Sequence, residues 1–438
     1  MSLPVLVLRG LFGVVVMIGI AYAFSTNRRA IDWRLVGVGI GLQLVFAVLV
    51  LYTSPGEALF SAIGNGFDQI LSFTYEGSEF IFGELGAPGG GQTFGNIFAF
   101  QVLPTIVFFA SLMGVLYHLG LVQPLVRGMS QFMAWAMRIS GAESLATAAN
   151  VFIGQTEAPL VVEPYIKSMT RSELMTLMTG GMATIAGGVL AAYISFLGGE
   201  DAAARAEFAG HLLSASIMSA PAAIVMAKIL VPETEDSPTF GDVEVNIETK
   251  DANVLDAAAN GASEGLRLAL NVGAMLLAFI ALIAMINYGL SLLGNPSFFG
   301  TEWYDLNALI AQATNGQFES LSLEAVFGFV FAPLAWAMGV EAADILQFGT
   351  LLGQKIAVNE FVAFASLGEM EAVLSERSVI IGTYALCGFA NFSSIAIQIG
   401  GIGGIAPERR SEIAELGLRA VIGGALASWT TASIAGML

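Results

Sequence analysis

Few residues of this chain carry a charge. Charged residues make up 12% of its 438 residues, whereas hydrophobic residues make up 56%. A soluble domain has about 25% charged residues, so this composition excludes an ordinary soluble protein and indicates several membrane spans. Lysine and arginine number 17 against 35 aspartates and glutamates. These basic residues are too few and too scattered for a nucleic-acid-binding surface.

Cysteine and histidine are nearly absent. The single cysteine, Cys387, excludes a disulfide bond within the chain and a cysteine-rich metal site. The two histidines, His118 and His211, lie far apart in the sequence, which argues against a histidine-based zinc site. The predicted spans hold neither an HExxH motif nor an aspartate pair. The sequence therefore predicts that the protein is not an enzyme and has no cofactor.

Long apolar runs fill most of the chain, and a spanning helix needs about 20 such residues. The first run is longer than a signal-peptide core and is interpreted as a retained helix. Residues 58–86 mix aromatic and acidic residues, which is typical of an amphipathic segment on the membrane surface. The acidic stretch 232–253 is predicted to be a solvated cytoplasmic linker. Eight segments qualify as spans: residues 4–24, 35–53, 97–120, 172–197, 207–230, 264–294, 376–399 and 411–437.

Two further segments, 131–168 and 332–368, are apolar with polar centres and resemble each other. Ala134-Trp-Ala-Met137 in the first recurs as Ala335-Trp-Ala-Met338 in the second, and each segment is followed by two spans. The distribution of lysine and arginine places the start of the first unit inside and that of the second outside. The sequence therefore predicts inverted repeats, each with a re-entrant hairpin that helps to build a midplane site.

The polar centre of the first hairpin is Gly154-Gln-Thr-Glu-Ala-Pro159, in which Gln155, Thr156 and Glu157 are adjacent. A carboxylate at bilayer depth costs about 3 kcal/mol or more and normally marks a functional site. Gly154 and Pro159 both interrupt a helix, which frees backbone groups at the hairpin tip to bind a solute or an ion.

Five polar residues elsewhere are further candidates. Glu360 is the polar centre of the second hairpin, and Asn391 and Ser394 are spaced to share one face of the seventh span. Asn150 precedes the first hairpin tip, and Thr184 lies in the fourth span. Structural roles remain open for these residues: the hydroxyls could bond their own helices, Asn391 could link helices, and either glutamate could pair with a buried lysine such as Lys355 or Lys167.

The clustered groups include carboxylates, amides and hydroxyls but no basic residue. This set suits a neutral, hydroxylated or amide-bearing solute better than an anion. A channel is the alternative, but two carboxylate-lined hairpins that occlude a site suit a coupled carrier better.

Four motifs resemble those of the concentrative nucleoside transporter family, in its bacterial eight-span form. They are Gly-Gln-Thr-Glu-Ala-Pro-Leu at 154–160, Asn-Glu-Phe at 359–361, Gly-Phe-Ala-Asn-Phe-Ser-Ser at 388–394 and Ser-Ala-Pro-Ala at 219–222. The resemblance runs from about residue 97 to the end of the chain. It implies an all-α polytopic membrane protein with eight transmembrane helices, two re-entrant hairpins, interfacial helices and inverted repeats.

The resemblance also implies roles for individual residues. Gln155, Thr156 and Glu157 would contact the nucleobase, and Glu360, Asn391 and Ser394 the ribose hydroxyls. Val189 and Phe389 would line the pockets for base and ribose. Sodium would lie near the first hairpin tip, at positions that the resemblance matches to Asn150, Ile153, Thr184 and Ile185.

The expected protein is a homotrimeric symporter that imports nucleosides with a sodium gradient through the lipid bilayer of a bacterial inner membrane; a proton-coupled nucleoside symporter is the alternative. The expected organisation has four parts. Residues 1–130 form N-terminal scaffold spans and an interfacial helix, 131–230 the first repeat, 231–320 an acidic loop and the sixth span, and 321–438 the second repeat.

Overall fold

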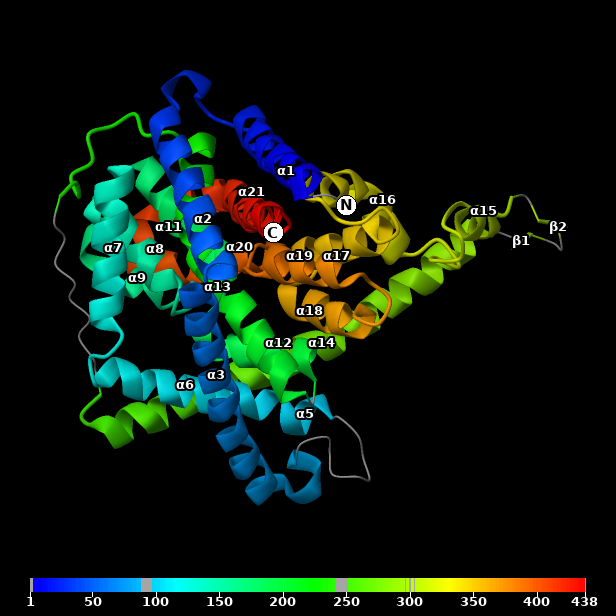
Figure 1. The fold of residues 1–438 in the computed structure, drawn as a ribbon, viewed down its shortest axis with the longest axis horizontal. Helices are drawn as coiled ribbons and strands as arrows, with labels where there is room; N and C mark the ends of the chain where they lie inside the picture. The colour runs from blue at the N-terminus through cyan, green and yellow to red at the C-terminus, as the bar shows by residue number, and fades with distance from the viewer. Residues whose placement is uncertain are drawn as a thin grey trace.

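Helices account for nearly the whole fold (Figure 1). The computed structural model describes residues 3–87, 97–199, 201–241, 251–295, 297–298, 301–302 and 304–437. Most of the glycine-rich segment 86–91 lies outside these residues, as does most of the second half of the acidic stretch 232–253.

The N-terminal helices precede the first repeat. Their bounds are α1 (Leu3–Ala23), η1 (Arg28–Ala30), α2 (Trp33–Tyr52), α3 (Ser54–Phe82), η2 (Gly83–Gly86), α5 (Phe98–Gln101) and α6 (Leu103–His118). The segment predicted to be amphipathic lies within α3 and η2, and α3 packs against α13 of the first repeat.

The two predicted repeats contain the same order of elements. The first holds α7 (Gln123–Met137), α8 (Gly141–Asn150), α9 (Ala158–Val161), α10 (Glu163–Ile166), α11 (Arg171–Ala183), α12 (Gly187–Gly198) and α13 (Ala202–Leu230). The second holds α16 (Leu323–Met338), α17 (Ile345–Ala357), α18 (Glu360–Met370), α19 (Glu376–Leu386), α20 (Phe392–Ile405), η4 (Pro407–Arg409) and α21 (Arg410–Ala435). In each, a helix packs on the first arm of a hairpin, α7 on α8 and α16 on α17.

Between the repeats lies the long helix α14 (Val254–Gly294), which packs along α6. It is followed by a two-residue strand pair, β1 (Ser297–Phe298) and β2 (Thr301–Glu302), and by α15 (Leu306–Ala313). The strands are antiparallel, with Ser297 opposite Glu302 and Phe298 opposite Thr301.

Six helical stretches of the described residues are long and apolar enough to cross a membrane. The other two predicted spans, 376–399 and 411–437, are not among these six stretches. The segment 376–399 is divided between α19 and α20, while 411–437 is α21, a helix of 26 residues with several charges near its start. The fourth span is also broken, between α11 and α12. Hydropathy does not reveal either break, because each contains only one polar residue, Thr184 or Asn391, among apolar ones.

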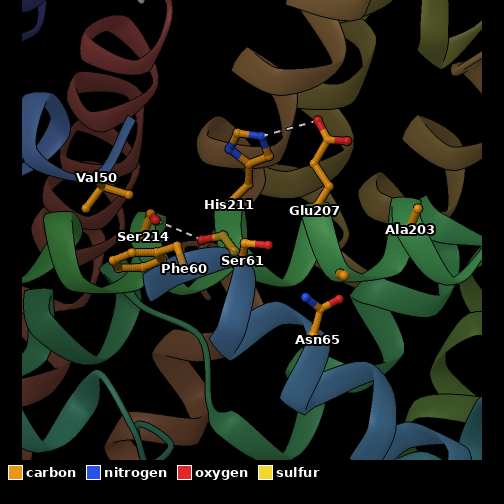
Figure 2. A pocket seen from close by; sticks show the side chains of 10 residues that line it. Val50, Phe60, Ser61, Asn65, Ala203, Glu207, His211 and Ser214 are labelled. Atoms are coloured by element: carbon orange, nitrogen blue, oxygen red, sulfur yellow. Dashed lines mark hydrogen bonds and ion pairs between the residues drawn. The ribbon is translucent and has the colours of Figure 1, made fainter. Parts of the chain in front are cut away.

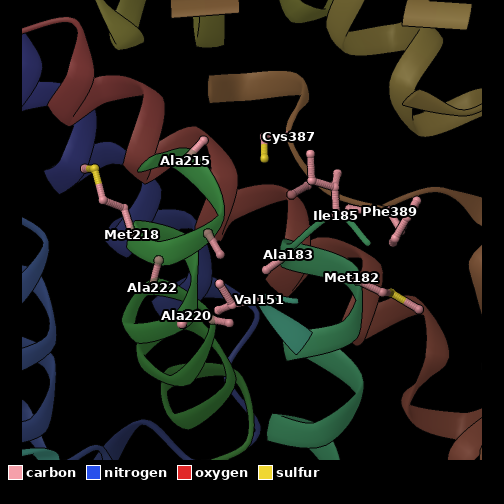
Figure 3. Packing of buried hydrophobic residues seen from close by; sticks show 14 of the residues in the cluster. Val151, Met182, Ala183, Ile185, Ala215, Met218, Ala220, Ala222, Cys387 and Phe389 are labelled. Carbon is pink, nitrogen blue, oxygen red and sulfur yellow. The ribbon is translucent and has the colours of Figure 1, made fainter. Parts of the chain in front are cut away.

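The two breaks pack against each other (Figure 3). Gly388 has a φ of 141°, a conformation that other residues rarely adopt. A Cβ atom at this position would lie 2.8 Å from the carbonyl oxygen of Met182 and 2.9 Å from that of Ala183. Cys387, Phe389 and Ile185 lie around this contact and are buried. Glycine therefore allows the two unwound segments to meet backbone to backbone.

The helix α13 forms the centre of the core. In its apolar, membrane-length stretch 89% of the residues are buried, against 17% in the corresponding stretch of α14. Its sequence is rich in alanine and serine, and small residues allow neighbouring helices to approach closely in a membrane protein. It packs against α2, α3, α11, α12, α19 and α21.

A buried ionic cluster holds the base of the first hairpin. Lys228, near the end of α13, pairs with Glu143 at the start of α8 and with Glu233 at 3.3 Å. Ser237 and Thr239 each donate a hydrogen bond to Glu173. The acidic stretch 232–253 was predicted to be a solvated linker, and Glu235 and Asp236 are indeed exposed. Glu233, Ser237 and Thr239, however, fasten its first part to helix ends. Removing one partner of such a buried pair typically costs about 3–5 kcal/mol.

The crossing of the breaks gives a stability prediction. Gly388→Ala is expected to lower the free energy of unfolding by about 1–3 kcal/mol or more, because the methyl group would be strained and would collide with the backbone of α11. Thermal unfolding of the purified protein in detergent measures this. The control is Gly400→Ala in α20, where a Cβ atom would meet nothing within 4 Å. Equal unfolding temperatures for the two variants would show that the backbones do not meet as described.

Candidate functional site

Four of the predicted site residues form one buried hydrogen-bonded set. Gln155 of the first hairpin donates from Nε2 to Ser394 Oγ at 3.0 Å. The backbone N–H of Ser394 donates to Asn391 Oδ1 at 2.9 Å, and Asn391 Nδ2 donates to Glu360 Oε2 at 2.8 Å. All four side chains are buried. The set links both hairpins through the broken seventh span.

Helix N-termini position the last three of these residues. Asn391 is the N-cap of α20, and Glu360 is the first residue of α18, which Asn359 caps. The N-terminal end of a helix carries a partial positive charge that stabilises a nearby carboxylate. Asn391 and Ser394 were predicted to share a helix face, but their spacing reflects a cap instead: the asparagine oxygen accepts the N–H three residues on.

Tyr193 of α12 belongs to the site, although sequence reasoning missed it. Its hydroxyl donates to Glu360 Oε1 at 3.3 Å, so each oxygen of this buried carboxylate accepts a hydrogen bond. Its ring stacks on Phe364, with centroids 4.5 Å apart. A tyrosine in an otherwise apolar helix is the signal that could have found it, since a buried phenol needs a partner.

Lys355, one of the two lysines considered as partners of a site glutamate, is fully buried. Its ammonium donates to the carbonyl oxygen of Ala385 at 2.8 Å and to Ser428 Oγ at 2.7 Å. Among the described residues it forms no ion pair within 4.0 Å with Glu360. Lys167 pairs with Glu408 at 3.4 Å on the surface. Lys355 therefore binds the C-terminal end of α19 and stabilises the broken span beside the site.

Thr156 and Glu157 lie outside the hydrogen-bonded set and are exposed, whereas Gln155 is buried. The Glu157 carboxylate folds back over Gly154, where a side chain would collide with it. It is close enough to Tyr117 of α6 and Glu264 of α14 to interact with them electrostatically. The first hairpin tip therefore faces the long helices α6 and α14.

The two residues predicted to line the pockets for base and ribose are buried. Val189 lies buried in the first turn of α12, four residues before Tyr193, and Phe389 lies in the unwound segment two residues before Asn391.

The residues predicted for sodium gather where two helices end. Asn150 ends α8 and Thr184 follows α11; both are buried, as is Ile185, and Ile153 is half-buried in the hairpin tip. Asn150 donates to its own helix at 3.0 Å, and its buried Oδ1 atom has no hydrogen-bond partner among the described residues. Thr184 donates to the carbonyl of Gly180 at 3.0 Å, and a Cβ atom on Gly180 would lie 3.4 Å from Asn150 Nδ2. An unpaired buried oxygen beside helix C-termini fits a small cation.

A separate cavity lies between α3 and α13 (Figure 2). Its polar lining includes His211, which is 3.8 Å from Glu207 and 3.3 Å from the hydroxyl of Tyr384. None of the predicted site residues lines this cavity. It is therefore distinct from the candidate site.

Comparison with known proteins identifies the family. The profile described as "Na+ dependent nucleoside transporter C-terminus" matches residues 211–436, its N-terminal counterpart matches 12–85, and "Nucleoside recognition" matches 99–200. The chain belongs to the sodium-dependent nucleoside transporter family. An uncharacterized transporter of Haemophilus influenzae is 44% identical over 437 residues, covering 98% of this chain and 97% of its own. Sodium/nucleoside cotransporter 1 of Rattus norvegicus is 39% identical over 97% of this chain and 63% of its own length.

A solved structure has the same fold. CNTnw in an inward-facing substrate-bound state superposes with a TM-score of 0.84 at 41% identity, covering 98% of each chain. The predicted family and the all-α membrane fold are therefore confirmed. The prediction that this transporter is not an enzyme is confirmed by the family and its named relatives.

The cap at Asn391 gives a second stability prediction. Asn391→Ala is expected to have a free energy of unfolding about 1 kcal/mol lower than Asn391→Ser, because serine retains a capping oxygen and alanine does not. The alanine variant should therefore unfold at the lower temperature. Both variants lose the donor to Glu360, so their difference isolates the cap. Thermal unfolding in detergent measures it. Identical unfolding of the two variants would mean that this side chain does not cap α20.

Proposed function

We propose that this transporter is a secondary active symporter that imports nucleosides with a sodium gradient. The observation that carries the proposal is the set of contacts from Gln155 through Ser394 and Asn391 to Glu360. It joins an amide on one hairpin to a carboxylate on the other, at the crossing of two broken helices. Membership of the sodium-dependent nucleoside transporter family supports both the substrate and the ion.

The chemistry of the set fits a nucleoside. In our proposal Gln155, Thr156 and Glu157 contact the nucleobase, which both donates and accepts hydrogen bonds. Glu360, Asn391 and Ser394 contact the ribose hydroxyls, since a carboxylate accepts two hydroxyl donors well. The apolar Val189 and Phe389 line the two parts of the pocket. A guest without charge is consistent with the lack of basic side chains in this set.

Sodium is proposed to bind at Asn150, Ile153, Thr184 and Ile185. The support is the unpaired Asn150 Oδ1 atom, which lies at the hairpin tip only a few residues before Gln155. A cation that orders this tip would raise nucleoside affinity, and the nucleoside would raise cation affinity by the same factor. One sodium ion crossing 100 mV supplies about 2.3 kcal/mol, or roughly 50-fold accumulation of a neutral solute.

The proposed transporter has a moving part and a fixed scaffold. Two hairpins with the fourth, fifth, seventh and eighth spans would move against a scaffold of the first, second, third and sixth spans. The scaffold helix α14 has a largely exposed apolar surface, including Leu270, Leu277 and Ile280, which suits contact with lipid and with other subunits. We place a homotrimer in the inner membrane of a bacterium.

The site assignment predicts the effect of neutralising either carboxylate. Glu360→Gln and Glu157→Gln are each expected to lower the kcat/KM of uridine uptake into proteoliposomes about 10- to 100-fold, because a hydrogen bond to a charged group contributes about 1.5–3 kcal/mol. Glu163→Gln is the matched control, because Glu163 is exposed on the same hairpin. Full activity of both site variants would refute the assignment.

The ion assignment predicts the effect of removing the unpaired oxygen. Replacing sodium by choline is expected to weaken uridine binding to the unmodified protein about 5- to 150-fold, the usual range of such coupling. Asn150→Ala should abolish this difference, whereas Asn260→Ala on the exposed side of α14 should keep it. Binding is measured at two pH values. Tight binding in choline that strengthens at the lower pH would reject sodium in favour of protons.

A further inference from the structure

A buried glutamine of α20 lies behind the proposed nucleobase contact. Gln398, which is 1% exposed, donates from Nε2 to the carbonyl oxygen of Met178 at 2.9 Å and to Gln155 Oε1 at 3.2 Å. Gln155 in turn donates to Ser394 at 3.0 Å. Gln398 thus connects α11 and α20 to the one residue of the first hairpin that joins the polar set.

The Met178 carbonyl fixes which way both amides point. A carbonyl oxygen only accepts hydrogen bonds, so the atom of Gln398 that faces it must be the NH₂ group. The same NH₂ group faces Gln155, which must therefore present its oxygen to Gln398. The NH₂ group of Gln155 is left on the other side, toward Ser394. One backbone atom thus sets the orientation of two side chains.

Two hydrogen-bonding groups of the Gln155 amide are not used by Gln398 and Ser394. After these contacts it has one N–H donor and one oxygen lone pair, in a fixed spatial order. Nucleobases differ in this order: a uracil-type edge presents a carbonyl acceptor where a cytosine-type edge presents an amino donor. An amide that cannot turn over would favour one of these orders.

The packing supports a role in positioning over one in stability. A Cβ atom on Gly181 would lie 2.9 Å from Gln155 Cβ and 3.0 Å from Gln398 Nε2, so the glycine makes room for the two glutamines. The Oε1 atom of Gln398 is buried and has no hydrogen-bond partner in the part of the chain that the structure describes. An unpaired buried polar atom destabilises a fold, and an apolar side chain of similar size would avoid it.

We propose that Gln398 is a specificity-determining residue, which holds the Gln155 amide in one orientation and thereby sets the preference between keto-type and amino-type nucleobases. This inference depends on the proposed function, in which Gln155 contacts the base. Gln398 acts through Gln155 and is a positioning residue.

The test compares uridine with cytidine in proteoliposome uptake. In Gln398→Leu and Gln398→Met the Gln155 amide is free to turn. The ratio of the KM for uridine to the KM for cytidine is therefore expected to change at least about fivefold, in the direction of equal KM values. The maximal uptake rates should stay within about twofold of those of the unmodified protein. Neither variant should unfold at a lower temperature, because each removes the unpaired oxygen. The control is Gln43→Leu in α2, a buried glutamine that donates to Gly39 of its own helix and accepts from Thr431 of α21, far in sequence from Gln155; it should leave the ratio unchanged.

Several results would overturn the inference. An unchanged KM ratio in both variants would show that Gln398 does not direct Gln155, and an equal rise of both KM values would show a merely structural role. Failure of both variants to fold would show that the glutamine is kept for stability. If the unmodified protein took up neither nucleoside, the proposed function itself would fail, which is a distinct outcome.

Discussion

The fold depends on satisfying a carboxylate deep inside an apolar protein. Glu360 is buried, and each of its oxygens accepts a hydrogen bond, one from Tyr193 and one from Asn391. It also lies at the positive N-terminal end of α18. These contacts require the seventh span to unwind at Asn391 and α12 to bring its tyrosine alongside. The break at Gly388 and the close contact with α11 follow from the same requirement.

Helix N-termini and helix C-termini lie in different regions of the candidate site. The N-terminal ends of α18 and α20 surround Glu360 and Asn391, where polar groups of an uncharged guest would be bound. The C-terminal ends of α8 and α11 lie beside the Oδ1 atom of Asn150, where the proposed sodium ion would be bound. The first hairpin tip connects the two regions within a few residues. In the proposed function, order at one region would affect the other through this tip, which gives the coupling a physical basis.

Much of this arrangement could be predicted from the sequence. The apolar runs gave the membrane fold, and the polar centres of the hairpins singled out Gln155 and Glu360. The breaks in two spans could not be seen, because each contains only one polar residue, Thr184 or Asn391, among apolar ones, and hydropathy does not register an unwound backbone. Tyr193 and Gln398 were missed for a related reason: each lies in a largely apolar helix that also holds serine, and only tertiary contacts show which polar residues are partners of the site. The burial of Lys355 likewise depends on where α19 ends.

The central claim is that Gln155 and Glu360, from two separate hairpins, hold one nucleoside between them. The most direct test is an experimental structure of the transporter in lipid nanodiscs with uridine and sodium. The claim predicts density for one uridine with its base within hydrogen-bonding distance of Gln155 and its ribose within the same reach of Glu360. Density for uridine at any other place, with these two side chains still joined only to protein groups, would contradict it.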